Sequence, residues 1–360
     1  MTEKETLIQE FVAKAIPKAL LSDVRLEDVT GNTRTDAAAW VSLGKEKGFH
    51  AYFEMKNTLS LAALMDSILL LKQCKHDGNN AVSILLSSYL SDKKQTMLRE
   101  NGIGFIDSLG NAWIETDTIL IDRRGNKPDQ AFSLTKKGQN IFSDKATLVS
   151  RLLFNGAQRG VREISSTLET LGFSLSPGYV SKVIASLTEE RYIKQGSQGA
   201  YLINRELFLE DWVSVYKRKK ARETREGWYC PSSNVEELAF HIGSQISEHG
   251  VLTDRAGSYF YDQHVSFESV DVIVRDRKGV QELLRALNAK PVDRGANINL
   301  IDPYYRVSAF FGIQKMGGVH VASNLQLYLD LSCQPKRGLE AAEHLYQQRI
   351  LPLINGEVDV

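Results

Sequence analysis

Cysteine is scarce in this sequence, and its scarcity excludes several kinds of site. The chain has 360 residues and only three cysteines. Cys74, Cys230 and Cys333 form no CxxC pair and have no histidine cluster nearby, so we expect neither a disulfide framework nor a zinc site. A reducing cytoplasm is the compartment that fits this cysteine content best.

Long apolar runs and an excess of one charge are also missing. No segment reaches the length that spans a bilayer, and residues 1–9 lack the apolar core of a secretory signal. We therefore expect a cytoplasmic protein with no membrane association. The 44 basic and 44 acidic residues cancel, which excludes a polyanion binder that uses its whole surface. Any contact with nucleic acid must use a local basic patch.

The common catalytic signatures are absent as well. The sequence contains no glycine-rich phosphate loop, no HExxH and no GxSxG, and its seven histidines are isolated from one another. With 360 residues the chain exceeds a single core, so we expect two or three domains. Its mixture of helical and extended patterns predicts a multidomain α/β (α+β) protein.

The most informative pattern lies in residues 144–203. Apolar residues recur at helical spacing over residues 146–153, and Glu163–Leu168 opens a second short amphipathic helix. Gly172 ends that helix, and Ser176-Pro177 then supplies an N-cap and a first helical residue. A third helix is expected to begin there, which gives a helix-turn-helix.

This third helix has one apolar and one polar face. An apolar stripe at i, i+3, i+4 and i+7 runs from Val180 to Leu187, and we expect it to pack inward. Hydroxyls and one ammonium group on the opposite face suit the major groove of DNA, where they reach phosphates and base edges. The residues of this outer face are Tyr179, Ser181, Lys182 and Ser186.

A hairpin pattern follows the third helix directly. Residues 192–195 and 200–203 are typical of strands, and glycines flank the turn between them. Three helices followed by a hairpin predict a winged helix-turn-helix that reads DNA, over residues 140–205. Its candidate DNA contacts are Ser176, the outer face of the third helix, and Lys194 and Gln198 in the hairpin.

A basic run comes after the hairpin. We expect residues 206–227 to form a basic linker helix in which Lys217, Arg218, Lys219 and Lys220 neutralise phosphates beside the reader. An ordinary solvated linker helix explains this run equally well. A helical bundle with a hairpin and no role in DNA binding is the alternative for the whole region, since Glu189 and Glu190 would repel phosphate.

The first 139 residues predict a separate α/β domain. Its expected order is a helix, three strands, a helix, a strand, a helix and a strand, closed by a hairpin. Asp36 opens the second strand and Glu54-Met55-Lys56 closes the third. An acid followed by ExK on neighbouring strands is the spacing of restriction-endonuclease-like cores.

This spacing suggests a mechanism for a nuclease. Asp36 and Glu54 could hold Mg²⁺ through oxygen ligands while Lys56 stabilises an attacking hydroxide or the developing phosphate charge. ExK is common, however, and Thr35 stands where a proline usually precedes the acid. A decayed nuclease-like fold and an unrelated domain are the alternatives, and for them we expect no metal and no cofactor.

Residues 228–360 predict a third α/β domain. The most distinctive patch in it is Gln326–Leu331, which follows Ser323-Asn324 and precedes Arg337-Gly338. The segments expected to form its helices and strands are Val235–His249, Phe260–Phe267, Val270–Arg275, Gly279–Leu287, Ile298–Ile301, Val319–Ala322 and Gly338–Arg349.

Several stretches together resemble a known family, the AbiEi-like antitoxins, which are transcriptional regulators of type IV toxin-antitoxin systems. The likeness covers residues 80–350. The residues that carry it are Gly102–Ile114, Ser143–Ile203, Val321–Leu331, Arg337-Gly338 and Glu340–Ala342.

The resemblance implies a repressor that binds inverted repeats in its own promoter through the winged helix. It places the reading of DNA on the outer face of the third helix. It also implies that a separate C-terminal region counteracts a nucleotidyltransferase-like toxin, without necessarily binding it. The first 139 residues, with their nuclease-like order, are a departure from the compact members of the family.

The sequence therefore favours a transcriptional regulator of antitoxin type that binds double-stranded DNA with sequence specificity. It favours a regulator over an enzyme. If the protein forms a homodimer, palindromic sites are expected. The rival hypothesis is a metal-dependent DNA nuclease with Asp36, Glu54 and Lys56 as its active site. A third is a protein-binding adaptor whose winged helix has lost its contact with DNA.

Overall fold

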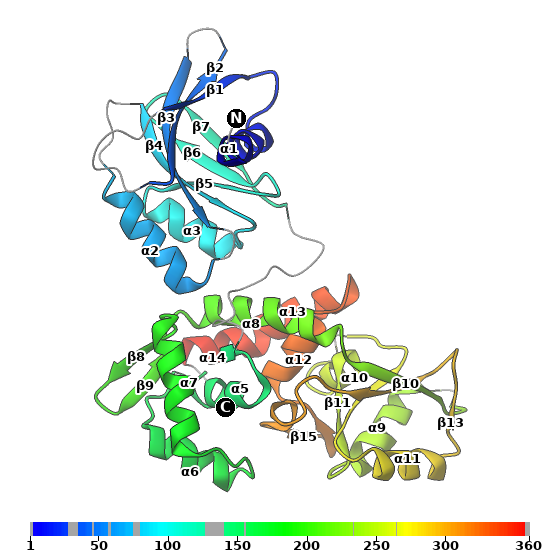
Figure 1. Cartoon of the computed structure of the whole chain (residues 1–360). Helices are drawn as coiled ribbons and strands as arrows, with labels where there is room; N and C mark the ends of the chain where they lie inside the picture. Colours follow the sequence, from blue (N-terminus) through cyan, green and yellow to red (C-terminus); the bar gives the residue numbers. More distant parts are fainter. Residues whose placement is uncertain are drawn as a thin grey trace. The chain divides into compact units, whose positions relative to one another are not determined.

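The computed structural model describes residues 3–27, 35–44, 47–56, 59–74, 80–126, 140–154, 156–232, 234–263 and 265–356. Two compact units make up the chain. The first is Met1–Gly138 with Glu189–Arg191, and the second is Gln139–Thr188 with Tyr192–Val360. Figure 1 shows the elements of both units.

The first unit has the element order that the sequence predicts. One helix precedes three strands, helices then alternate with strands, and a hairpin closes the unit. Its elements are α1 (Glu3–Ala15), β1 (Leu21–Glu27), β2 (Ala37–Leu43), β3 (Lys47–Lys56), α2 (Leu61–Lys72), β4 (Ala81–Ser87), α3 (Asp92–Glu100), β5 (Gly104–Asp107), β6 (Ala112–Glu115) and β7 (Leu120–Arg123).

The seven strands of this unit form one mixed sheet in which they follow the order of the chain. β3, β4 and β5 run parallel because α2 and α3 connect them, and the other neighbouring pairs are antiparallel. α1 packs Phe11 and Val12 on one face with Ile84, while α2 packs Leu64 on the other face with Leu85. The alternation of side chains along β4 thus serves two cores.

Parts of the predictions lie outside the described residues. They are residues 1–2, 28–34, 45–46, 57–58, 75–79 and 127–139 of the predicted first domain, and residues 155, 233 and 264 further along the chain.

The second unit begins with three helices and a hairpin, which we call the helix–hairpin module (residues 144–202). Each element lies where the sequence predicts it. The elements are α5 (Asp144–Leu153), α6 (Val161–Thr170), α7 (Pro177–Glu189), β8 (Ile193–Gly196) and β9 (Gly199–Leu202).

The remainder of the second unit, residues 205–355, forms the C-terminal region. It contains a second seven-stranded sheet with helices on both faces. Its elements are α8 (Arg205–Lys220), β10 (Thr224–Tyr229), α9 (Val235–Gln245), β11 (Gly250–Thr253), α10 (Asp254–Tyr259), β12 (Val270–Val274), α11 (Arg277–Ala286), β13 (Lys290–Pro291), β14 (Ile298–Asp302), η1 (Ser308–Phe310), β15 (Gln314–Met316), β16 (Val319–Val321), α12 (Asn324–Leu331), α13 (Arg337–Leu345), η2 (Tyr346–Ile350) and α14 (Leu351–Asn355).

The second sheet is built from contacts between distant segments. Its strand order is β13-β10-β14-β12-β11-β16-β15, with β12 and β14 parallel, β11 and β16 parallel, and the other pairs antiparallel. β12 lies at the centre, and all five of its residues are buried. Four of the five are apolar, and burial on both faces is what a central strand requires.

Two expectations from the sequence are wrong in this region. Residues 206–227 do not form a linker, because α8 buries an apolar face that includes Phe208 and Trp212, and β10 already belongs to the second sheet. Phe260–Phe267 forms neither helix nor strand in its described positions, since α10 ends at Tyr259 and the next strand begins at Val270.

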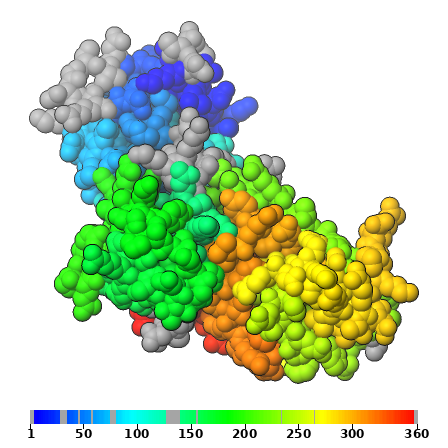
Figure 2. All heavy atoms as spheres, turned by 60° about the horizontal axis from the view of Figure 1, so that its bottom comes forward, coloured from blue at the N-terminus to red at the C-terminus, as the bar shows by residue number. Residues whose placement is uncertain are grey.

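The helix–hairpin module packs directly on the C-terminal region. The Asp144 carboxylate accepts hydrogen bonds from the backbone N–H groups of Val307 (3.0 Å) and Ser308 (2.8 Å), and the Tyr305 hydroxyl donates to the carbonyl of Phe142 (2.7 Å). Figure 2 shows the module, in green, beside the orange part of the C-terminal region. Within the described ranges, no helix is long and apolar enough to cross a membrane.

Candidate nucleic-acid interface

Helix α7 presents the polar face that the sequence predicts. Its apolar stripe is buried, with Val180 and Leu187 fully inaccessible. On the opposite side Ser181 and Lys182 are exposed, while Tyr179 and Ser186 are half-buried. The helix holds these four side chains on one face because they alternate with the stripe at helical spacing.

The start of α7 is fixed by its cap. The hydroxyl of Ser176 accepts a hydrogen bond from the N–H of Tyr179 (3.2 Å), and its carbonyl accepts from Val180 (3.0 Å). Pro177 takes the first helical position, where a missing N–H costs nothing. Ser176 is exposed, so its role in the structure is a cap that stands at the edge of the polar face.

The hairpin after α7 has a short turn and is held by the loop that precedes α6. Gly196 pairs with Gly199 across a two-residue turn, and both Lys194 and Gln198 are exposed. Arg159, in the loop before α6, exchanges two backbone hydrogen bonds of 3.0 Å with Ala200 of β9. The loop therefore pairs with β9 through a single β-bridge.

The basic run does not form the uniform cationic surface that the sequence suggests. Lys217 is half-buried on α8, and Lys219 lies with its Nζ 5.5 Å from the centre of the Tyr304 ring. The Arg218 side chain is partly buried, and burial lowers its pKa. Lys220 points inward, so its assignment as a phosphate contact is wrong.

Lys220 belongs to a buried polar network that sequence reasoning missed. Its Nζ pairs with the carboxylate of Asp330 and lies 3.6 Å from that of Asp254. Asp330 also accepts hydrogen bonds from the hydroxyls of Tyr216 (2.8 Å) and Thr253 (2.6 Å). Burial alone lowers the pKa of Lys220, but Asp254 and Asp330 outweigh it and raise that pKa above its ordinary value.

The network continues into the helix–hairpin module through Arg151. This arginine is fully buried, donates to Gln326 (2.7 Å) and lies 3.5 Å from the hydroxyl of Ser323. Gln326 in turn donates to Tyr216 (2.9 Å) and Asp330 (3.1 Å). The two polar residues of the distinctive 326–331 patch therefore bridge the module and the sheet.

A strained residue lies at the far end of the network. Asp254 has φ of +52° and is fully buried, a backbone conformation that costs energy in a residue with a side chain. Arg225 lies 3.4 Å from Asp254 and 3.6 Å from Asp271. Burial raises the pKa of Asp271 to about 6, and the neighbouring charge of Asp254 adds to that shift.

Two of the candidate nuclease residues of the first unit, Glu54 and Lys56, form an ion pair, and Asp36 bonds to the backbone between them. Lys56 Nζ lies 2.5 Å from Glu54, and the Asp36 carboxylate accepts a hydrogen bond from the N–H of Met55 (2.9 Å). Glu54 is almost fully buried, and Lys4 also pairs with Asp36 at 3.4 Å. Among the described residues, no group of three or more histidine, cysteine, aspartate or glutamate side chains could hold a metal ion.

One comparison with known proteins gives a match. Residues 201–351 match a family model described as a transcriptional regulator, the AbiEi antitoxin of a type IV toxin-antitoxin system. The match covers the C-terminal region and stops short of α7, so the similarity to antitoxins is carried by that region alone. No curated protein and no solved structure matches the chain significantly.

Proposed function

We propose that this protein is a DNA-binding transcriptional regulator of antitoxin type that represses its own operon. The observation that carries the proposal is α7, whose polar face is exposed while its cap, its apolar stripe and the following hairpin hold it in place. A helix presented in this way has the size and chemistry of a recognition helix in the major groove, with the hairpin as a wing.

The proposed contacts follow from accessibility. Ser181 and Lys182 reach base edges and phosphates, Tyr179 and Ser186 flank them, and Ser176 adds a hydroxyl at the helix start. Lys194 and Gln198 contact the backbone from the wing. Of the basic run, Lys217, Arg218 and Lys219 remain as candidates for phosphate contact.

The antitoxin assignment rests on the similarity of residues 201–351 to the AbiEi family. It implies a toxin partner, which we propose to be a nucleotidyltransferase-like protein encoded beside this chain. An antitoxin that represses its own operon would couple the expression of the antitoxin gene to that of the toxin gene. A homodimer would double the reading helices and favour a palindromic operator.

A mobility-shift assay with the DNA upstream of its own gene tests the proposal. We expect a specific complex that survives at a salt concentration where unrelated DNA dissociates. Lys182→Ala and Ser181→Ala should weaken it about tenfold or more, with the loss of Lys182 also reducing the salt dependence. Lys278→Ala is the matched control, because Lys278 is a highly exposed lysine on α11.

Two results would count against this function. Equal, salt-labile affinity for every sequence would remove specific reading, and unchanged binding by the α7 variants would remove the helix from the interface. Co-expression with the adjacent toxin gene gives a second readout, since growth arrest that this protein fails to relieve argues against the antitoxin role.

A metal-dependent nuclease in the first unit is the second candidate. The observations in its favour are the ion pair of Glu54 with Lys56 at the end of β3 and the hydrogen bond of Asp36, just before β2, to the backbone N–H of Met55. In that reading the two carboxylates would hold Mg²⁺ and the restriction-endonuclease-like fold would be an active one.

A further inference from the structure

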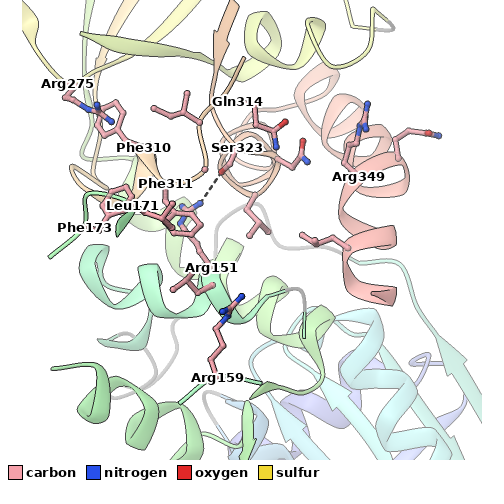
Figure 3. Close-up of a pocket in the computed structure, with 17 residues that line it drawn as sticks. Arg151, Arg159, Leu171, Phe173, Arg275, Phe310, Phe311, Gln314, Ser323 and Arg349 are labelled. Carbon is pink, nitrogen blue, oxygen red and sulfur yellow. Dashed lines mark hydrogen bonds between the residues drawn. The ribbon is translucent and has the colours of Figure 1, made fainter. Parts of the chain in front are cut away.

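A cavity of about 780 Å³ lies where the helix–hairpin module meets the C-terminal region (Figure 3). Both sides of this cavity belong to the second unit. The volume is within the range of sites that bury most of a small molecule. No residue of the predicted DNA-contacting set lines it, so it is a second site on the protein.

The charge of the cavity wall is one-sided. Arg151, Arg159, Arg275 and Arg349 line it, and no acidic side chain does. Arg159 also pairs with Glu163 at 2.9 Å, and Glu163 is not part of the wall. Like charges around a cleft of low dielectric repel one another unless an anion joins them, so the wall favours an anionic ligand.

Some polar atoms of the wall also lack partners. Arg151 Nε and Arg159 Nε are buried donors without a hydrogen-bond partner among the described residues. Asn324 Oδ1 is a buried acceptor that also lacks a partner there. These atoms have almost no accessible surface and Arg151 is fully buried, so the cations of the wall that a ligand can reach are Arg275, Arg349 and the half-buried Arg159.

Three phenylalanine side chains, Phe173, Phe310 and Phe311, also line the cavity. Phe311 packs against Phe173 with ring centres 5.7 Å apart, and Arg275 stacks on Phe310 with its guanidinium carbon 4.3 Å from the ring centre. Flat apolar surfaces beside arginines bind a planar ring next to a negative group. A nucleotide has both, a base for the rings and phosphates for the arginines.

We infer that this cavity binds a nucleotide and that its occupancy regulates the DNA reader. The regulatory half of the inference rests on the proposed function. Its physical route is short, because Arg159 is paired through its backbone with β9 of the hairpin, and Leu171 and Phe173 line the cavity from the turn that leads into α7. A ligand that holds these residues biases both elements of the reader.

Calorimetric titration of the full chain without DNA tests the binding. ATP and AMP are the nucleotide probes, and inorganic phosphate is the probe for the anion alone. We expect saturable binding of a nucleotide, weakened at least tenfold by Arg275→Gln, by Arg349→Gln and by Phe311→Leu. Arg306→Gln is the matched control, since Arg306 is an exposed arginine of the same region. Circular dichroism checks that each variant is folded.

Three outcomes overturn the nucleotide site. They are no binding of either nucleotide, binding that all three cavity variants leave intact, and phosphate binding as tight as nucleotide binding. A mobility shift repeated with saturating nucleotide tests regulation, for which we expect at least a threefold change in DNA affinity. No change there overturns the regulatory half only, and a failure of DNA binding itself leaves the calorimetric result standing.

Discussion

At the scale of single residues, burial decides what a charge does. Lys220 and Lys182 have the same side chain, yet Lys220 neutralises Asp330 in the interior while Lys182 stands free on α7. A buried ion pair is costly to break because its partner is left charged and desolvated. The chemistry of a residue thus follows from the surroundings that the fold gives it.

Glu223 gives a pH dependence with a definite sign. Its Oε1 accepts a hydrogen bond from the N–H of Tyr304 (2.9 Å), while Oε2 is buried without a partner among the described residues. Burial raises the pKa of Glu223 to about 7, against the opposing charge of Lys220. Between the ordinary pKa of a glutamate and about pH 7, Glu223 therefore stays protonated in the folded chain but loses its proton in the unfolded chain. The free energy of unfolding therefore falls as the pH rises toward 7.

Glu223→Gln removes this titration. We expect the variant to be more stable than the natural chain at pH 8, by on the order of 2 kcal/mol, and nearly equal to it at pH 4.5. Thermal unfolding at the two pH values measures the difference. Glu282→Gln is the control, because Glu282 is exposed. A variant less stable than the natural chain at pH 8 would show that the charged form of Glu223 is the favoured one.

At the scale of elements, the hairpin depends on one close approach. Gly199 has φ of +135°, and a Cβ at this position would lie 2.2 Å from the backbone carbon of Arg159. Only glycine permits this contact, and the contact gives the two hydrogen bonds between Arg159 and Ala200. The position of the hairpin beside the loop before α6 therefore depends on a residue without a side chain.

Gly199→Ala should separate the hairpin from the loop behind it. We expect a loss of about 1–3 kcal/mol in unfolding free energy, because the clash is with backbone and the φ is unfavourable. DNA affinity should fall with it. Gly178→Ala is the matched control on α7, where a Cβ meets nothing within 4 Å and a helix favours alanine. Equal stability of the two variants in urea unfolding would refute this account of the wing.

At the scale of the whole molecule, the helix–hairpin module is built into the unit that carries the similarity to antitoxins. α5 is buried along eight consecutive residues because the C-terminal region covers the side that an isolated module would leave in water. Arg151 and Asp144 on this helix bond to that region. The module and the C-terminal region therefore form one packed unit. The first unit is separate, with its own sheet and two cores.

The nuclease candidate belongs to this first unit and has its own test. It predicts cleavage of plasmid DNA by the full chain with Mg²⁺ or Mn²⁺, reduced at least a hundredfold by Glu54→Gln. Glu115→Gln is the control, because Glu115 is exposed on β6 of the same sheet. Cleavage that Glu54→Gln leaves unchanged comes from another source and removes the candidate. The regulator proposed for the second unit is unaffected by either result.

The elements that the sequence predicts well are those with local causes. α7 follows from the cap at Ser176, the proline after it and the apolar stripe, all within a few residues of one another. The first unit follows in the same way from alternation and helical spacing. The missed strand β10 has no such pattern, since Thr224–Tyr229 carries charges and a glycine and becomes a strand only by pairing with β14 and β13.

The sequence by itself determined the order of elements in the first unit and in the helix–hairpin module, the polar face of α7, and the similarity to antitoxins in residues 201–351. Caps, periodicity and motifs depend on residues that are close together in the chain. The tertiary structure alone decided that Lys220 is an interior partner of Asp330, and that Arg275, Phe311 and Arg349 meet around one cavity. These residues are brought together by a sheet whose strands pair although they are far apart in the chain. Spacing in the sequence does not show which distant strands pair.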